Sequence, residues 1–332
     1  MSASLPLDCI LGRCDSLRAE VFFRAEVPPG VAADEAALIG TLSGPDCRHA
    51  ITLPVTAKLG PVPGPAATEA PAAATTLVAR TILTEPSFWT PELPGLYRLD
   101  ARLVAAGREV AAWRRPVGLR RLGVRGRSLW LDGRRYVPRG LVASAERVEL
   151  PAFRAASLAV VVPDPSEAFL AHCDAEGVAA IALLADAAGK PCDLEAAAAT
   201  IARWAWHPAL VAAVVPRGVS AEAAGGLATA TRGRRGTLLV AWEADGSRPP
   251  PAVPVGVDLL VVTLSAGGLP HEAWRTEPPA VPLVARRLFD EASASAAQSP
   301  SRRECDALQA ALAGWGTAAG DPAPDWAGYV VG

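Results

Sequence analysis

Alternating apolar and polar residues dominate the first third of the chain. Residues 17–27 place apolar side chains at every second position and alternate with Arg18, Glu20, Arg24 and Glu26, and residues 97–103 alternate in the same way with Arg98, Asp100 and Arg102. A period of two is typical of strands with one buried face. Residues 75–83 and 109–119 are further candidate strands, whereas the proline- and alanine-rich residues 60–74 predict a surface loop. Several short strands without a clear helix predict a β-sandwich.

After about Gly126 the pattern changes to short, continuous apolar runs separated by alanine-rich stretches. Such runs are typical of parallel strands buried on both faces. Eight of them occur, at residues 136–142, 157–162, 178–184, 210–215, 237–242, 259–264, 282–285 and 329–331. Eight strands joined by crossovers predict a compact (β/α)₈ TIM barrel of roughly 200 residues. A doubly wound sheet is the alternative, but no glycine-rich phosphate loop follows any of these runs to support it.

Helix signals lie between several of the apolar runs. Residues 164–167 (DPSE) form a candidate capping box, so residues 169–176 should be helical. Residues 193–206 carry their large apolar side chains on one stripe. A last helix should run through residues 301–312 and stop at Gly314. We therefore expect two domains, a sandwich over residues 1–125 and a barrel over residues 126–332.

Composition excludes several classes of function. The 332 residues carry a net charge of −2, and 20% are charged against 51% hydrophobic, so no basic surface is expected to bind nucleic acid. The amino terminus lacks the features of a signal peptide, and no apolar run reaches the ~18 residues that span a bilayer. The six cysteines and four histidines show no metal-binding spacing. These features predict a soluble, cytoplasmic protein with reduced thiols, without a metal or cofactor and without membrane contact.

Five stretches, in the same order along the chain, resemble segments of glycoside hydrolase family 2. That family includes β-galactosidases, β-glucuronidases and β-mannosidases. The stretches are residues 85–97 (EPSFWTPELPGLY), 117–120 (VGLR), 129–140 (LWLDGRRYVPRG), 169–177 (FLAHCDAEG) and 206–210 (WHPAL). The resemblance implies an immunoglobulin-like β-sandwich followed by a TIM barrel, without a counterpart of the family's amino-terminal jelly-roll domain. Within these stretches, Asp132-Gly133 predicts a tight turn, and Trp89 and Tyr97 are large apolar anchors.

The catalytic carboxylates that this family uses are missing at their expected places. In the family, a glutamate after the fourth barrel strand is the acid/base, and here that position falls on Gly218. The nucleophile, a glutamate that ends the seventh strand, falls on Arg286 or Arg287. A retaining glycosidase needs two carboxyl groups about 5–5.5 Å apart, and neither glycine nor arginine can replace them. The resemblance therefore implies a glycosidase-like protein that has lost its activity.

Two carboxylates and an aromatic residue follow the fifth apolar run. Trp242, Glu243 and Asp245 lie where functional residues gather in a barrel, at the carboxyl end of a strand. They are either a relocated catalytic pair beside a sugar-stacking tryptophan, or a solvated loop. Asp290-Glu291 after the seventh run is a second candidate for the nucleophile, or an acidic helix start.

Arginines are the remaining candidate ligand-binding residues. Arg217, Arg286 and Arg287 either form a cationic mouth for an anionic ligand or are ion-paired. With Trp242, Arg217 and Arg287 form the candidate ligand-binding set, and His207 before the fourth strand is expected to be structural. The function predicted is a pseudo-glycosidase that binds a carbohydrate or a protein partner. The alternative is an active hydrolase of O-glycosyl bonds that uses relocated carboxylates such as Glu243.

Overall fold

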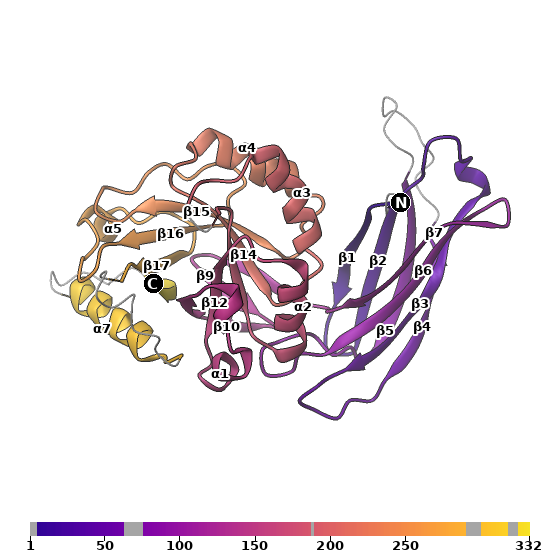
Figure 1. Cartoon of the computed structure of the whole chain (residues 1–332), viewed down its shortest axis with the longest axis horizontal. Coiled ribbons are helices and arrows are strands. Elements are labelled where there is room, and N and C mark those ends of the chain that lie inside the picture. Colours follow the sequence, from indigo (N-terminus) through magenta and orange to yellow (C-terminus); the bar gives the residue numbers. More distant parts are fainter. Residues whose placement is uncertain (1–4, 63–75, 187–188, 290–299, 318–324) are drawn as a thin grey trace. The chain divides into compact units, whose positions relative to one another are not determined.

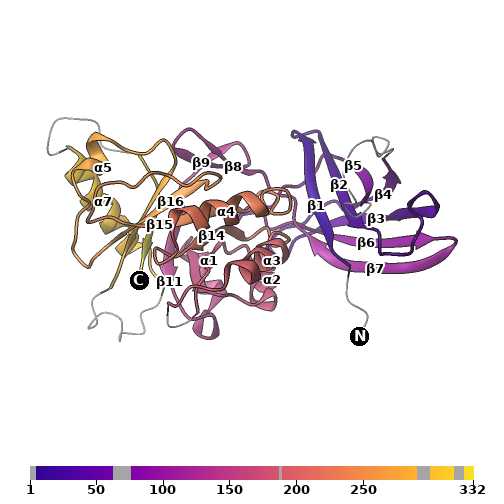
Figure 2. The same cartoon turned by 90° about the horizontal axis from the view of Figure 1, so that it is seen from above.

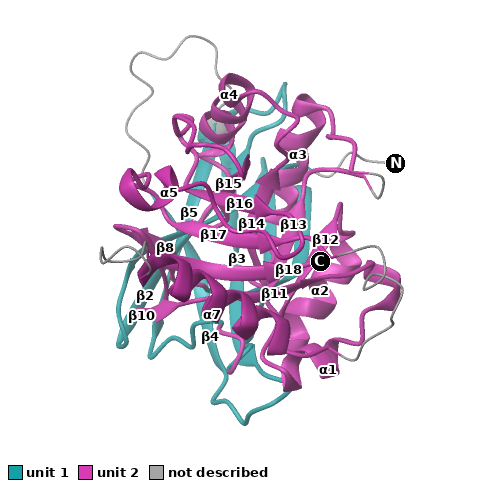
Figure 3. Ribbon diagram, turned by 90° about the vertical axis from the view of Figure 1, so that its left-hand side faces the viewer, with its two compact units in different colours: residues 1–89, 93–119 teal, residues 90–92, 120–332 magenta. Residues whose placement is uncertain are grey.

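The computed structural model describes residues 5–62, 76–186, 189–289, 300–317 and 325–332. The chain divides into two compact units, coloured separately in Figure 3. The first comprises Met1–Trp89 and Leu93–Leu119, and the second comprises Thr90–Glu92 and Arg120–Gly332. The chain enters the second unit for the last time at Arg120, while the sequence-based boundary lies after residue 125.

The first unit is one antiparallel sheet that curls until its two halves face each other, which fits a β-sandwich (Figure 2). Its strand order is β1-β2-β5-β4-β3-β6-β7. The strands are β1 (Leu7–Cys14), β2 (Arg18–Glu26), β3 (Ala36–Asp46), β4 (Val55–Pro61), β5 (Thr76–Thr84), β6 (Leu96–Ala105) and β7 (Arg108–Val117). A one-turn 3₁₀ helix, η1 (Ala33–Glu35), precedes β3.

The core of this sheet lies between its two halves. Along β2, Ala19, Val21, Phe23 and Ala25 are buried and the residues between them are not, which is the alternation that the sequence predicts. The strands β1, β3 and β4 were not predicted, because their burial does not alternate cleanly. The predicted loop of residues 60–74 is wrong at its start, where Gly60 and Pro61 end β4. Residues 63–74 of that loop lie outside the described residues.

The second unit contains a closed barrel of eight parallel strands, in sequence order (Figure 1). The strands are β11 (Arg139–Val142), β12 (Ala159–Pro163), β13 (Ala180–Leu183), β14 (Leu210–Val215), β15 (Leu239–Asp245), β16 (Leu259–Leu264), β17 (Leu283–Arg287) and β18 (Trp326–Val331). Each overlaps one of the eight predicted runs, so the barrel is confirmed and the doubly wound sheet is wrong. The strands β14, β15, β16 and β18 are buried at nearly every position, because the sheet is covered on both faces.

A small three-stranded sheet precedes the barrel, with the order β10-β9-β8. Its strands are β8 (Leu122–Arg125), β9 (Ser128–Leu131) and β10 (Arg134–Tyr136). Asp132 and Gly133 join β9 to β10 with φ of 48° and 77°. Positive φ at both central residues is the geometry of a type I′ hairpin turn, as Asp-Gly predicts. Leu122, Leu129 and Leu131 pack into the core of the barrel.

Helices connect most of the barrel strands in the described residues. They are α1 (Leu150–Ala155), α2 (Glu167–Glu176), α3 (Leu194–Trp204), α4 (Ala221–Thr231), α5 (Ala273–Thr276) and α7 (Arg303–Thr317), with a 3₁₀ turn η2 (Ala145–Arg147) before α1. The predicted capping box of α2 is displaced, because Ser166 rather than Asp164 caps the helix by accepting from the Phe169 N–H. The predicted stop at Gly314 is also wrong, since α7 continues to Thr317. The helix contains both Gly314 and Gly316, and each glycine inside a helix costs only about 1 kcal/mol relative to alanine.

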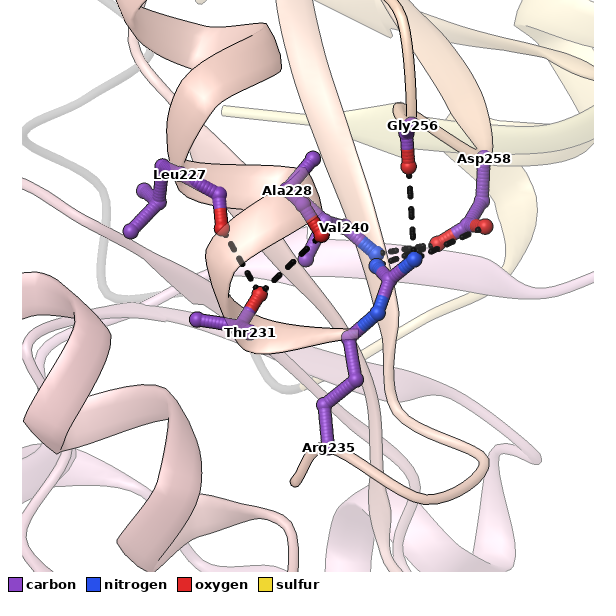
Figure 4. A network of polar contacts seen from close by, with 7 residues as sticks. All are labelled: Leu227, Ala228, Thr231, Arg235, Val240, Gly256 and Asp258. Atoms are coloured by element: carbon purple, nitrogen blue, oxygen red, sulfur yellow. Dashed lines mark hydrogen bonds and ion pairs between the residues drawn. The ribbon is translucent and has the colours of Figure 1, made fainter. Parts of the chain in front are cut away.

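A polar network fixes the amino-terminal end of two barrel strands (Figure 4). The guanidinium of Arg235 donates to both carboxylate oxygens of Asp258, at 2.6 and 3.2 Å. Asp258 also accepts from the Val240 N–H of β15 at 2.8 Å. Arg235 precedes β15 and Asp258 precedes β16, so the network fixes the amino-terminal ends of these two strands. Functional sites in this architecture lie at the opposite, carboxyl-terminal end of the barrel. Among the described residues, no helix has both the length and the apolar character needed to cross a bilayer.

Candidate functional site at the mouth of the barrel

Polar side chains replace the apolar core at the carboxyl ends of three adjacent strands. Ala241 of β15, Val261 of β16 and Val284 of β17 belong to the apolar core of the barrel. Because side chains alternate along a strand, the next inward-facing positions are Glu243, Thr263 and Arg286. These positions face the mouth, which is where function is located in this architecture.

Glu243 is held by three donors at this end of the barrel. Its Oε1 accepts from the Thr263 hydroxyl at 2.6 Å and from Arg286 Nη1 at 3.1 Å. Its Oε2 accepts from the Arg217 backbone N–H at 3.3 Å. The side chains of Arg286 and Glu243 are only 15% and 11% exposed, so this is a largely buried ion pair. Both carboxylate oxygens are therefore occupied, and the charge of Glu243 is compensated.

The barrel below these residues has no room for a sugar. An apolar cavity of about 20 Å³ lies there, lined by Val161, Ile181, Val214 and Val261, with Arg286 as its polar member. This space corresponds to about one water molecule. A ligand at this end of the barrel would have to bind above Arg286, among the loops that follow the strands.

Asp245 lies on the same face of β15 as Glu243, two residues further on. Since a strand rises roughly 3.3 Å per residue, their Cα atoms are about 6.6 Å apart. Asp245 Oδ1 accepts from the Ser247 hydroxyl at 2.7 Å and from the Ser247 N–H at 3.0 Å. These hydrogen bonds, together with the charges of Arg217 and Arg248, lower the pKa of Asp245. Glu243 and Asp245 thus form a pair of carboxylates on one face of β15: Glu243 is paired with Arg286, and the half-buried Asp245 lies 3.7 Å from Arg248 Nε.

Trp242 points away from the barrel interior, because it lies between two inward-facing residues of β15. Its Nε1 donates to the Val219 carbonyl at 3.1 Å, in the loop that follows β14. The structure therefore places the indole against this loop, and not beside Glu243 and Asp245.

The arginines named by the sequence separate onto different sides. Arg286 faces the interior, whereas Arg287 donates through Nη2 to the Gly268 carbonyl at 3.3 Å, in the loop after β16. Burial lowers the pKa of Arg287. Arg217 is exposed after β14, and only its backbone N–H contacts Glu243. Arg248, in the loop after β15, lies 3.7 Å from Asp245 Oδ2, so Arg217, Arg248 and Arg286 are the cations next to the two carboxylates.

The ends of the fourth and seventh strands carry no carboxylate among their described residues. β14 is followed by Pro216, Arg217 and Gly218, and β17 ends in Arg286-Arg287. A Cβ at Gly218 would meet only Pro191 Cγ at 3.6 Å, so space does not require glycine there. Asp290-Glu291 lies outside the described residues. Within the described ranges, no group of three or more His, Cys, Asp or Glu side chains is arranged to hold a metal ion.

Sequence reasoning missed a buried network at the opposite end of the barrel. Asp174 Oδ2 lies 2.6 Å from His207 Nδ1, and Oδ1 accepts from the Ala209 N–H at 2.8 Å. Arg120 donates to the Pro208 carbonyl at 2.6 Å and to the Thr237 hydroxyl at 3.1 Å. Burial raises the pKa of Asp174 and lowers that of Arg120 to about 10.

The network is far from the mouth, because it surrounds the residues that precede β14 and β15. His207 is accordingly placed as a structural residue. In the sequence, His207-Pro208 precedes the fourth barrel strand, and Asp174 lies in the helix between the second and third barrel strands. Only the fold brings these residues together.

Comparison with solved structures identifies the fold. No family model and no curated protein matches the sequence. A β-glucuronidase from Ruminococcus gnavus superposes with a TM-score of 0.63 at 12% identity, over 99% of this chain and 61% of that one. A β-glucuronidase from Bifidobacterium dentium gives 0.61 at 12% identity, over 99% and 60%. A glycosyl hydrolase family 2 member from Bacteroides cellulosilyticus gives 0.58 at 14% identity, over 84% and 40%.

These values support a glycosidase fold like that of glycoside hydrolase family 2, and at such low identity they show the fold alone. The chain spans between 40% and 61% of the length of these structures.

Proposed function

We propose that the protein is a non-hydrolytic relative of the family 2 glycosidases, whose barrel mouth binds a ligand without cleaving it. One observation carries this proposal: the most deeply placed carboxylate of the mouth, Glu243, has both oxygens engaged by Arg286, Thr263 and the Arg217 N–H. A nucleophile or general base must present a free oxygen to its target. Glu243 can do so only by leaving Arg286 unpaired in a largely buried place.

The residues at the two strand ends support the same conclusion. By resemblance, the acid/base position is Gly218 and the nucleophile position is Arg286 or Arg287. Glycine holds no proton to transfer, and a guanidinium stays protonated and has no lone pair to attack with. A cation there would also oppose the positive charge that develops on the sugar ring in an oxocarbenium-like transition state.

The ligand that fits this mouth is a carbohydrate that carries a carboxylate. Arg217, Arg248, Arg286 and Arg287 lie at these strand ends or in the loops that follow them, and arginine pairs with carboxylates in bidentate geometry. One of the matched structures is a β-glucuronidase in complex with D-glucuronic acid, a sugar of this class. A protein partner that presents an acidic side chain is the other ligand compatible with these arginines.

One observation favours a second candidate function, an active hydrolase. Glu243 and Asp245 share a face of β15, and catalytic carboxyl groups of glycosidases lie about 5–10 Å apart. In this case Asp245 would be the more exposed carboxylate, and Glu243 would have to exchange Arg286 for substrate.

Hydrolysis of p-nitrophenyl β-galactoside, β-glucoside, β-mannoside and β-glucuronide by the purified full chain separates the two functions. The wild type, Glu243→Gln and Asp245→Asn are assayed together with a boiled control. We expect no turnover above the boiled control with any of the three. Turnover by the wild type that disappears in either variant would establish the hydrolase and remove the proposal.

We further propose that the first unit is an immunoglobulin-like sandwich. Its order β1-β2-β5-β4 with β3-β6-β7 corresponds to the two sheets of a constant-type immunoglobulin domain. The Tyr97 hydroxyl, near the start of β6, accepts from the Ser87 N–H at 2.9 Å. A tyrosine at this corner that bonds back to the chain before its strand is a feature of such sandwiches.

A reducing, cytoplasmic setting is the location we propose for the protein. All six cysteines are free thiols, and Cys173 and Cys305 are buried. Burial raises the pKa of Cys305 to about 11, which keeps this thiol protonated and unreactive.

A further inference from the structure

A groove opens in the first unit where β4 changes partners. Val55–Leu59 of β4 pair with β3, and only Gly60 and Pro61 pair with β5. β5 pairs with β2 along its whole length, Thr76–Thr84. The strands β4 and β5 therefore diverge from the Gly60–Arg80 contact onward. The space between them, which we call the β4–β5 groove, has a volume of about 470 Å³ and is lined by Thr56, Lys58, Gly60, Arg80, Thr81 and Ile82.

Backbone groups of β5 face this groove without a strand partner. The Val62 N–H donates to the Val78 carbonyl at 3.0 Å, so the backbone of Val78 faces β4. Antiparallel strands direct alternate residues to opposite neighbours, which places Ile82 and Thr84 on the same side as Val78. In the part of the chain that the structure describes, no strand pairs with these two residues on that side. They form a short open sheet edge of the kind to which an extended segment can add as a further strand.

The side chains around the groove are basic and apolar. Lys58 is exposed, and Arg80, with 46% of its side chain exposed, lies 4.0 Å from Glu20. Thr81 is 2% exposed, and among the described residues its hydroxyl has no hydrogen-bond partner, an unusual state for a buried polar group. Ile82, on the same face as Arg80, and Val55, on the opposite face, also expose large apolar side chains.

We infer that the β4–β5 groove docks an extended acidic segment of a partner protein, which adds as a strand along Ile82 and Thr84. The open edge supplies the backbone hydrogen bonds, and Lys58 and Arg80 select acidic side chains. Apolar residues that alternate with the acidic ones would lie on the opposite face of the sheet, which Val55 shares with the buried Leu59. This site is separate from the barrel, and it does not depend on the function proposed for the mouth.

The charges of the groove argue against a second copy of this chain as the occupant. A symmetric pair formed through the same edge would place Lys58 and Arg80 of one copy near the same residues of the other. Like charges across paired strands are destabilising. An acidic segment gains from both cations, so charge complementarity favours a different chain.

Binding of an eight-residue fluorescent peptide of alternating glutamate and valine to the full chain tests the inference, with a lysine–valine peptide as the charge control. We expect the acidic peptide to bind with a Kd in the range of roughly 10–100 μM, typical of a short contact, and the basic peptide not to bind. Lys58→Glu/Arg80→Glu should weaken binding at least about tenfold. Ile82→Pro should abolish it by removing one free N–H, since proline is tolerated at an open edge. Arg102→Glu, an exposed charge reversal on β6, should bind like the wild type.

The inference is overturned if the acidic peptide does not bind at ~1 mM, the weak limit of specific contacts, or if both peptides bind equally. It is also overturned if Arg102→Glu loses as much binding as Lys58→Glu/Arg80→Glu, or if the chain dimerises and Ile82→Pro makes it monomeric. Should Ile82→Pro fail to fold, the two charge-reversal variants decide the question.

Discussion

Glu243 shows how a single contact decides the chemistry of the mouth. Its partner Arg286 lies 43 residues away along the chain and on a strand that is not its neighbour. Thr263 of the strand between them completes the contact. A carboxylate and a guanidinium that are both nearly buried stabilise the fold only as a pair. If one partner is removed, the other stays desolvated without an opposite charge to compensate it.

Breaking this pair should therefore be costly. We predict that Arg286→Met lowers the free energy of unfolding by about 2–3 kcal/mol, at the lower side of values for fully buried pairs. The double variant Glu243→Gln/Arg286→Met should recover most of that loss, because no uncompensated charge remains. Urea denaturation of the wild type, both single variants and the double variant measures this coupling. Additive losses would show that the two side chains do not stabilise each other.

Tyr97 gives a prediction about pH at the same scale. Burial raises the pKa of its hydroxyl, and the hydrogen bond from the Ser87 N–H opposes this effect. The folded state therefore keeps the proton at a pH where the unfolded state has lost it. The stability that results is fully present below the unfolded pKa of about 10, and it is lost as the pH rises toward the folded pKa.

We predict that Tyr97→Phe costs about 1–2 kcal/mol at pH 7, because the Ser87 N–H loses its acceptor. The variant should also show a shallower fall in stability than the wild type between pH 9 and 11, the range around the usual tyrosine pKa. Urea denaturation at several pH values measures both effects. Identical slopes for the two proteins would mean that Tyr97 titrates alike in the folded and unfolded states.

Strand β3 depends on a glycine where it approaches β6. A Cβ at Gly40 would lie 2.1 Å from the Asp100 carbonyl oxygen and 2.8 Å from Ala101 Cα. Backbone atoms in a paired strand cannot move aside without breaking the pairing. Gly60 of the adjacent strand β4 is a matched control, since its Cβ would meet only the Arg80 carbonyl oxygen at 3.9 Å.

We predict that Gly40→Ala lowers the free energy of unfolding by on the order of 2–3 kcal/mol, as overpacking does. Gly60→Ala should change it by less than about 0.5 kcal/mol, as neutral surface substitutions do. Thermal and urea unfolding of the two variants give the comparison. An equal effect of both would assign the loss to strand propensity and not to the contact with β6.

At the scale of elements, helices and strands with a clear hydrophobic periodicity could be predicted from the sequence, and those without one were missed. The barrel strands read as continuous apolar runs because they are buried on both faces. The helix α4 was missed, since Gly225-Gly226 reads as a break. In the structure, a Cβ at Gly225 would lie 3.1 Å from the Val255 carbonyl oxygen, so close packing explains a glycine at this position. β4 was missed because only Leu59 of its seven residues is buried.

At the scale of the whole molecule, the order of elements was predictable and the site only in part. The sequence identified Glu243 and the arginines as candidates, because each follows or ends an apolar run. It could not pair Glu243 with Arg286, since that contact depends on how the fifth, sixth and seventh strands align in the closed barrel. The outward orientation of Trp242 follows from alternation along β15 and was accessible to sequence reasoning. The β4–β5 groove was not, because it arises from a strand that the sequence did not reveal.

The most direct test of the account is the hydrolysis of 2,4-dinitrophenyl β-glycosides, including the β-glucuronide, by the wild-type chain at high concentration. This leaving group departs with little protonation, so the assay does not require an acid at the Gly218 position and reports only on a nucleophile. We predict a rate of hydrolysis equal to that of the boiled protein. Turnover above that rate that Glu243→Gln or Asp245→Asn abolishes would contradict it, and would show that the barrel has kept a working carboxylate at its mouth.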